Sequence, residues 1–335
     1  MIPFKRANIL LPKNIDMTKW SVVACDQYTS EMDYWNEVEK IVGSSPSTLR
    51  ITLPEIFLED SDVNERINKI NDTMKEYLDE LKDSMIYLER TQADGRVREG
   101  LMGMVDLEDY SYEKGSQTLI RATEKTVIER IPPRLKVREN ALLELPHIMI
   151  LIDDEKKKII EDLKNEVTDS DVVYDFDLME NGGHIKGYKL NNDSMTKVEE
   201  GLEALCDKEY FEKKYNVKDK GILLFAMGDG NHSLATAKAN YENVKKTMTP
   251  DEYLNHPSRY ALVELVNLHS EALEFEPIHR VIFDTDVNKL IEELYKYYDI
   301  NEEGNGQYFE LVTKDIDKNY PESPKEVVKL HFQSI

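Results

Sequence analysis

The most hydrophobic stretch of the chain, residues 222–227, runs directly into a glycine-rich turn, and this junction constrains the fold more than any other feature. A short run that is apolar on both faces predicts a buried strand. After the turn, apolar side chains recur at spacings of three and four, which predicts an amphipathic helix. The helical stripe consists of Leu234, Ala237, Tyr241, Val244 and Met248. Residues 221–248 are therefore predicted to form a strand, a tight turn and a helix.

Strand and helix patterns alternate irregularly along the rest of the chain. Short apolar or alternating runs predict strands at residues 21–25, 86–90, 97–107, 147–152, 172–176, 185–190, 260–268 and 281–283. Helical patterns cover residues 31–42, 63–85, 119–145 with a break at Pro132-Pro133, 155–167 and 193–215. This order is typical of an α+β fold with a mixed sheet rather than a regular doubly wound sheet. The 335 residues contain no obvious linker, so we expect one compact unit over residues 1–335 or two intertwined subdomains.

The balance of charge argues against two classes of partner. The chain carries 66 acidic and 43 basic residues, a formal net charge of −23 at pH 7. Such a field repels nucleic acid and anionic membrane surfaces, so we expect neither as a partner. Two cysteines are too few for a disulfide framework or a zinc ribbon, and the first residues lack an export signal. We therefore expect a cytoplasmic protein, and the sequence leaves its oligomeric state open.

The turn after the apolar strand combines a predicted anion site with an acid and an imidazole. It reads Gly228-Asp229-Gly230-Asn231-His232-Ser233. The first N–H groups of a helix lack partners within the helix, and two glycines allow an anion to approach the backbone closely. Asp229 would repel a bare anion, so it favours a divalent cation beside the ligand or a proton to be accepted. His232 can donate to a phosphate or act as a general acid or base.

A simpler interpretation is a tight turn without chemistry, in which Ser233 only caps the helix. The turn is neither a phosphate-binding P-loop nor a complete dinucleotide-binding motif. From these residues alone the two interpretations are evenly balanced. Cys25, near the start of the chain, is interpreted as a core cysteine rather than a nucleophile that pairs with His232, because it ends an apolar strand.

Four segments of the chain, taken together, resemble one family. They are Cys25-Asp26-Gln27-Tyr28-Thr29-Ser30, Ile120-Arg121-Ala122-Thr123-Glu124-Lys125-Thr126, Gly228-Asp229-Gly230-Asn231-His232-Ser233-Leu234-Ala235-Thr236-Ala237 and Glu276-Pro277-Ile278-His279-Arg280. In this order they are similar to the uncharacterised bacterial and archaeal family called "domain of unknown function 1015". The resemblance implies that Asp26, Glu124, Arg130 and the pair His279-Arg280 join the glycine-rich turn in one site. Without it, Asp26 would be a turn residue, Glu124 and Arg130 surface ion pairs, and His279-Arg280 the edge of a strand.

That family is distantly similar to the ParB/sulfiredoxin-like fold, whose members include sulfiredoxin, the ParB nucleotide switch and free-serine kinases. The similarity implies a ParB/sulfiredoxin-like core containing the strand, turn and helix of residues 221–248. Two departures limit it. Asn231 stands where sulfiredoxin has its reactive cysteine, which excludes sulfiredoxin chemistry, and Ser233 replaces a phosphate-binding arginine. Arg121, Arg130 or Arg280 would then have to supply the positive charge for a triphosphate.

The resemblance leads to a nucleotide-dependent phosphotransferase acting on a small hydroxyl-bearing substrate, with ATP or ADP and Mg²⁺. In this hypothesis Asp229, His232 and Asp26 carry the chemistry, and Asp229 also binds the metal. The residues that bind the nucleotide are Gly228, Gly230, Asn231, Ser233, Arg280, His279, Glu124 and Arg130. We expect no zinc, haem or flavin.

Two alternatives remain open at this stage. One is a non-catalytic regulatory protein that binds a nucleotide or another small anion, which the replacement of arginine by Ser233 favours. The other is a small-molecule hydrolase that uses Asp229, His232 and water. A shared fold cannot choose among the three.

Overall fold

The computed structural model describes residues 2–22, 27–74, 78–145, 148–274, 282–301, 308–313 and 326–332. The chain divides into two compact units, Met1–Glu274 and Phe275–Ile335.

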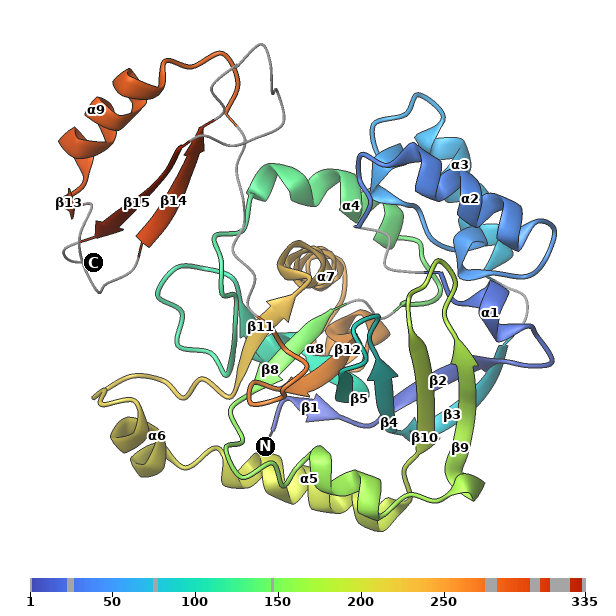
Figure 1. Ribbon diagram of the computed structural model, residues 1–335. Helices are drawn as coiled ribbons and strands as arrows, with labels where there is room; N and C mark the ends of the chain where they lie inside the picture. The colour runs from blue at the N-terminus through green and yellow to red at the C-terminus, as the bar shows by residue number, and fades with distance from the viewer. Residues whose placement is uncertain are drawn as a thin grey trace. The chain divides into compact units, whose positions relative to one another are not determined.

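A mixed ten-stranded sheet forms the centre of the first unit within the described residues (Figure 1). Its order is β6-β7-β11-β8-β12-β5-β4-β10-β9, and β1 pairs with β5 beside this path. The pairs β6/β7, β7/β11 and β8/β12 are parallel, and the others are antiparallel. The predicted α+β class with a mixed sheet is therefore confirmed.

The strands of this sheet are β1 (Phe4–Lys5), β4 (Ile86–Thr91), β5 (Val97–Asp106), β6 (Tyr110–Ser111), β7 (Ile120–Arg121), β8 (Met149–Ile152), β9 (Val172–Asp177), β10 (His184–Lys189), β11 (Phe225–Asp229) and β12 (Tyr260–Asn267). A separate antiparallel pair consists of β2 (Ala7–Pro12) and β3 (Leu78–Ser84). The helices are α1 (Met17–Trp20), α2 (Met32–Val42), α3 (Val63–Thr73), α4 (Ile131–Arg138), α5 (Asn192–Ala204), α6 (Lys208–Lys214), α7 (Asn231–Lys245) and α8 (Pro250–Leu254). No helix in the described part of the chain is long and apolar enough to cross a membrane.

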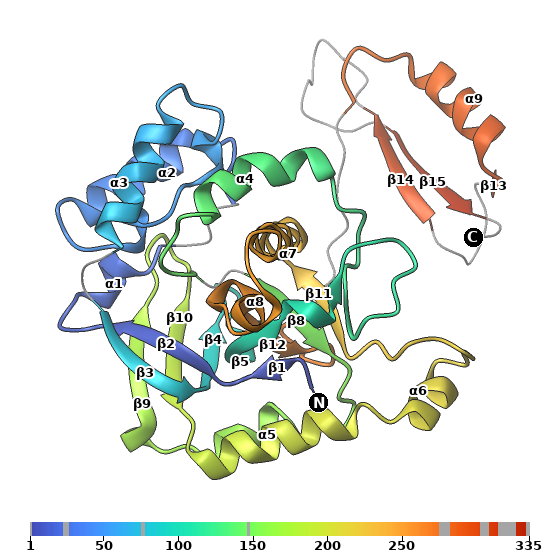
Figure 2. The ribbon, with the colours of Figure 1, turned by 180° about the vertical axis from the view of Figure 1, so that it is seen from behind.

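The two faces of the sheet have different neighbours. One face packs on α5, which runs along one side of the sheet in both views (Figures 1 and 2), and it contributes Tyr87, Leu101 and Ile150 to the main core. The opposite face carries α7 near the end of β5, where Lys238 Nζ donates to the carbonyl of Leu107. Elsewhere that face packs against β2 and β3 through Ile86, Leu88 and Met102, and part of it lines a cavity. This asymmetry places the candidate site.

Two predicted helices are wrong over much of their length. The pattern over residues 63–85 ends as a helix at Thr73, and β3 follows at residues 78–84, where pairing with β2 overrides the helical spacing. In residues 119–145 the helical part is confined to α4 and a short 3₁₀ turn, and β7 occupies residues 120–121. Pro132 and Pro133 begin α4 rather than break it, because the first helical positions need no N–H partner.

Other boundaries also shift. Residues 155–167 contain only a 3₁₀ turn at Glu161–Asn165, and the predicted helix 193–215 is two helices, the second capped by Asp207. Ser21, Val22, Ile282 and Phe283 lie in no strand, while residues 23–25 and 281 fall outside the described residues. The strands near residues 86, 97, 149, 172, 184 and 260 and the helix after the glycine-rich turn are confirmed.

The second unit is a helix with a small antiparallel sheet. Its elements are α9 (Val287–Tyr297), β13 (Ile300–Asn301), β14 (Tyr308–Thr313) and β15 (Glu326–Phe332). The strand order is β13-β15-β14, so the last strand in sequence lies in the middle.

The buried carboxylate of Asp106 ties together three parts of the first unit. Arg259 donates to both of its oxygens, at 2.9 and 2.8 Å, and Lys5 Nζ lies 3.1 Å away. The backbone N–H of Glu108 also donates to it. Burial opposes ionisation, but these donors outweigh burial and hold the pKa of Asp106 below its usual range. The contacts join β1, the end of β5 and the start of β12.

We expect Asp106→Asn to lower the free energy of unfolding by about 2–3 kcal/mol, because it leaves Arg259 and Lys5 without their carboxylate. A carboxyl group with a depressed pKa stabilises the fold above its unfolded pKa of about 3.9 and loses this effect as the pH falls through its folded pKa. Urea unfolding should therefore show a difference between variant and wild type that is constant near pH 7 and shrinks below about pH 4. Asp94→Asn, at an exposed ion pair with Arg96, is the control and should have little effect. An equal loss in both variants would contradict the assignment.

Candidate functional site

The junction between β11 and α7 depends on the backbone of Gly230. Its φ of 82° lies in the left-handed region, and it serves as the N-cap residue of α7. A Cβ at this position would lie 3.1 Å from the Cα of Ile148. Glycine is therefore required both for the conformation and for the close approach of a neighbouring segment. Ser233 is the third residue of α7, so the prediction that it caps the helix is wrong.

The segment after β7 is fastened to this turn by side-chain hydrogen bonds. Thr123 N donates to Asn231 Oδ1 at 3.3 Å, and Thr123 Oγ1 donates to the carbonyl of Met227 at 2.9 Å. Val127 N donates to His232 Nε2 at 3.2 Å, across 105 residues of sequence. Two of the four segments that suggested a family thus form one local structure. Asn231 and His232 are part of what holds it together.

The charges of Glu124 and Arg130 act on the imidazole of His232. Burial, followed by the positive charges of Arg130 and Arg134, lowers the pKa of His232, and Glu124 and Glu55 oppose the shift. Because Nε2 accepts a hydrogen bond, the neutral ring carries its proton on Nδ1. His232 is therefore a neutral donor near pH 7 rather than a cation.

Arg121 does not supply a free positive charge to this site. Its guanidinium donates to the carbonyls of Thr118, Gly221 and Ile222 at 2.6–2.7 Å. It fixes the segments that precede β7 and β11. Asp26, His279 and Arg280 lie outside the described residues.

Asp229 lies on the opposite side of the turn from these contacts and lines a cavity of about 1100 Å³. It is an exposed residue at the end of β11, and its carboxylate accepts from the N–H of Gly230 at 2.8 Å. The floor of the cavity is the sheet face turned away from α5. The register places Asp229, Met149, Glu264, Met102 and Ile86 in one row across this face.

Two glycines leave room for larger side chains to lie across the floor of the cavity. Gly187 and Gly100 both pair in register with Leu88, one on each side. A Cβ at Gly187 would overlap the ring of Tyr174, and one at Gly100 would overlap the carboxylate of Glu264. These side chains can therefore lie flat on the sheet. The walls come from α7, with Asn240 and Val244, and from the segment 138–145.

Charged residues on the cavity floor escaped the sequence analysis. Arg98 donates from Nε and Nη2 to the two oxygens of Glu264, at 3.0 and 2.9 Å. Arg90 pairs in register with Arg98 on the neighbouring strand and also lines the cavity. The sequence pattern that could have revealed them is the presence of charged residues on both faces of strands that are otherwise apolar. Gln27, from the first family segment, lines the same cavity, so this segment and the glycine-rich turn share it.

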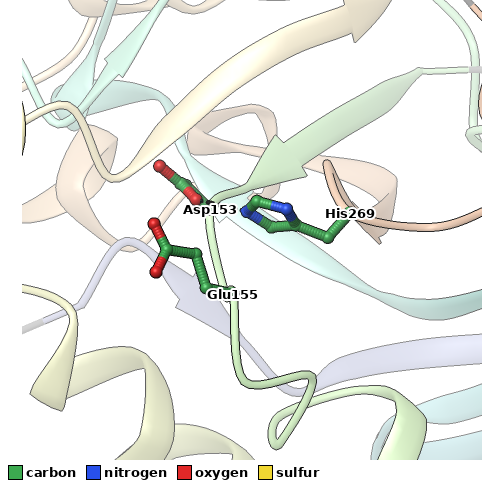
Figure 3. Close-up of side chains that lie close together, drawn as sticks. All are labelled: Asp153, Glu155 and His269. Carbon is green, nitrogen blue, oxygen red and sulfur yellow. Dashed lines mark hydrogen bonds and ion pairs between the residues drawn. The ribbon is translucent and has the colours of Figure 1, made fainter.

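A second cluster has the spacing of metal ligands. Asp153, Glu155 and His269 place their ligand atoms within 4.8 Å of one another, and Figure 3 shows the three side chains converging. Lys214 Nζ, however, lies 2.9 Å from an oxygen of each carboxylate, and His269 Nε2 lies 2.7 Å from Asp153. Although burial opposes it, hydrogen bonds to Asp153 and Glu155 raise the pKa of Lys214. The cluster is an ion-pair network around an ammonium group.

The sequence was compared with models of known protein families. The model of a family described as "protein of unknown function (DUF1015)" matches residues 2–331. The chain belongs to this family. No curated protein and no solved structure gives a significant match. The DUF1015 match spans both units and includes all four segments that carried the resemblance.

We expect Gly230→Ala to destabilise this DUF1015 protein more than Gly95→Ala. Both glycines have positive φ, but a Cβ at Gly95 would meet nothing within 4 Å. The control should lose about 1 kcal/mol of unfolding free energy, and Gly230→Ala roughly 2–3 kcal/mol because Ile148 must also move. Chemical denaturation measures both. Equal losses would show that the close approach to Ile148 does not matter.

The His232 environment predicts opposite effects of two neighbouring substitutions. Arg130→Gln should raise the pKa of His232 towards its ordinary value of about 6.5, and Glu124→Gln should lower it further. Because the folded state resists protonation of His232, stability should fall as the pH drops through about 6.5, and less so in Arg130→Gln. An NMR titration of the imidazole resonances gives the pKa directly. Identical titrations in the two variants would place Glu124 and Arg130 away from the ring.

Proposed function

We propose that this protein is a nucleotide-dependent phosphotransferase that acts on a small hydroxyl-bearing substrate. The observation that carries the proposal is the position of Asp229. Its carboxylate leaves the strand at the start of α7 and lines a cavity of about 1100 Å³. An acid at the end of β11, one residue before the N-cap of α7, thus lines an open cavity.

The groups around the turn have complementary roles in this proposal. The N-terminal amides of α7, with the partial positive charge of the helix end, bind phosphate oxygens of ATP or ADP. Asp229 binds Mg²⁺ or accepts the proton of the attacking hydroxyl. The charge of Arg130, close enough to shift the pKa of His232, offsets negative charge that develops during transfer. His279 and Arg280 remain proposed phosphate donors on the basis of the resemblance.

The size of the cavity supports a reaction with two ligands. Pockets for single ligands typically have volumes of about 300–1000 Å³. The cavity that Asp229 lines, about 1100 Å³, exceeds this range, and Gln27 lines it as well. A nucleotide and a small second substrate can be accommodated together. The proposal also draws on the distant similarity of the family to free-serine kinases and to the ParB/sulfiredoxin-like fold.

One observation favours a second candidate, a non-catalytic protein that binds a nucleotide or small anion. Asn231 hydrogen-bonds to Thr123, and His232 Nε2 accepts from Val127 N. Both side chains support the turn, which reduces the number of groups left for chemistry. Because His232 Nε2 is engaged by the backbone, a hydrolase built on an Asp229–His232 pair has less support than either candidate.

Asp229→Asn separates the two candidates. In the enzyme, we expect the variant to retain nucleotide binding and to lose at least about a hundredfold in turnover, because the acceptor of the proton or the metal ligand is gone. Calorimetry with ATP or ADP and Mg²⁺, and product analysis with a panel of hydroxy amino acids, measure the two properties.

Asp219→Asn is the matched control. Asp219 is exposed, lies outside the cavity lining and has a positive φ that asparagine tolerates. This variant should behave like the wild type. Nucleotide binding without any product in the wild type and in both variants would select the regulatory protein. Absence of both binding and turnover in the wild type would overturn the proposal.

A further inference from the structure

We propose that Arg90 binds the carboxylate group of a small organic anion on the floor of the cavity. Arg90 comes from β4 and lies on the same sheet face as Ile86, the residue at the end of the row opposite Asp229. The proposal goes beyond phosphoryl transfer, since a carboxylate can be held at Arg90 whatever reaction occurs at Asp229.

The hydrogen bonds of Arg90 are incomplete. Its Nε is buried without a partner, and its Nη2 reaches the carbonyl of Gly182 only at 3.5 Å, the outer limit for such a bond. Among the described residues, no ion pair involves Arg90. A guanidinium carries five N–H donors in a fixed fork, and a buried guanidinium is usually paired. A planar anion with two oxygens is the natural complement to this fork.

The neighbouring charges are already matched with each other. Arg98 forms its two hydrogen bonds with Glu264, so this carboxylate is committed. Burial, together with the charge of Arg98, lowers the pKa of Arg90, which indicates that its charge is poorly compensated. The three residues together carry one excess positive charge. A single carboxylate neutralises it, whereas a phosphate dianion would leave excess negative charge in a partly buried site.

The segment that contains Tyr28 reaches the same cavity, because Gln27 and Trp35 line it. Tyr28 influences the pKa of Arg90 and stacks on Tyr34, with ring centroids 3.7 Å apart. The hydroxyl of Tyr34 is buried without a hydrogen-bond partner, and burial raises its pKa to about 12, so it is a neutral donor. Tyr28 has a φ of 53°, a conformation that is uncommon for a bulky residue and that Trp35 supports by donating from Nε1 to the Tyr28 carbonyl.

The test uses the full chain and thermal unfolding in the presence of named anions. The probes are acetate, lactate, L-serine and inorganic phosphate, each titrated against the wild type, Arg90→Met and Arg96→Met. Arg96 is the matched control, because it lies on the same hairpin but forms exposed ion pairs with Asp94 and Glu274. We expect at least one carboxylate to raise the melting temperature of the wild type and of Arg96→Met. The same carboxylate should bind Arg90→Met about tenfold more weakly or worse.

The unliganded proteins provide a second measurement that requires no correct guess of the ligand. Arg90→Met should melt at the temperature of the wild type or above it, because it removes a poorly paired buried charge. Arg98→Met should melt lower, because it leaves Glu264 without its partner. A large destabilisation by Arg90→Met would mean that Arg90 is a structural residue and would overturn the proposal.

The remaining outcomes are equally decisive. Stabilisation by phosphate alone, lost in Arg90→Met, would replace the carboxylate with a phosphoryl ligand. No stabilisation of the wild type by any of the four probes at millimolar concentrations would also overturn the proposal. None of these measurements depends on turnover, so failure of the phosphotransferase proposal and failure of the Arg90 proposal can be distinguished.

Discussion

The left-handed backbone of Gly230 determines where the groups of the candidate site lie. It allows β11 to turn into α7 within one residue while Ile148 passes close to its Cα. On one side of this turn, Asn231 and His232 face the segment 123–127 and fasten it by hydrogen bonds. On the other side, Asp229 faces the cavity. A side chain at position 230 would have to displace Ile148 and would disturb both sides at once.

The cavity exists because the two faces of the sheet carry different side chains. The face on α5 is filled with large apolar side chains, whereas the opposite face combines apolar residues that pack against β2 and β3 with Gly100, Gly187 and charged side chains. Several charged residues that line the cavity form ion pairs with each other. Arg98 and Glu264 neutralise each other, and so do Arg138 and Glu144, whereas no ion pair of Asp229 or Arg90 occurs among the described residues.

The successes and failures of the sequence analysis follow from the range of the interactions involved. The strands around residues 86–91 and 97–106 and the helix after Gly230 were predictable, since their apolar spacing and their turns are local. The helix predicted to continue through residues 78–84 was not formed, because a strand 70 or so residues earlier pairs with this segment and rewards an extended backbone more than the helical stripe does. The contact of the 120–126 segment with the glycine-rich turn could be anticipated only from a family resemblance, because 108 residues separate Thr123 from Asn231.

The sequence by itself determined the family, the α+β class and the strand–turn–helix of the candidate site, and it singled out Asp229 and His232 as candidate residues. The tertiary structure alone decided which charges remain available. Arg90, Arg96 and Arg98 alternate along one hairpin and look alike in the sequence, yet Arg96 is exposed, Arg98 is paired with Glu264 and Arg90 lacks a full set of partners. The physical reason is that pairing depends on strand register: the partner of Arg98 is 166 residues away, and only the folded sheet brings it within hydrogen-bonding distance.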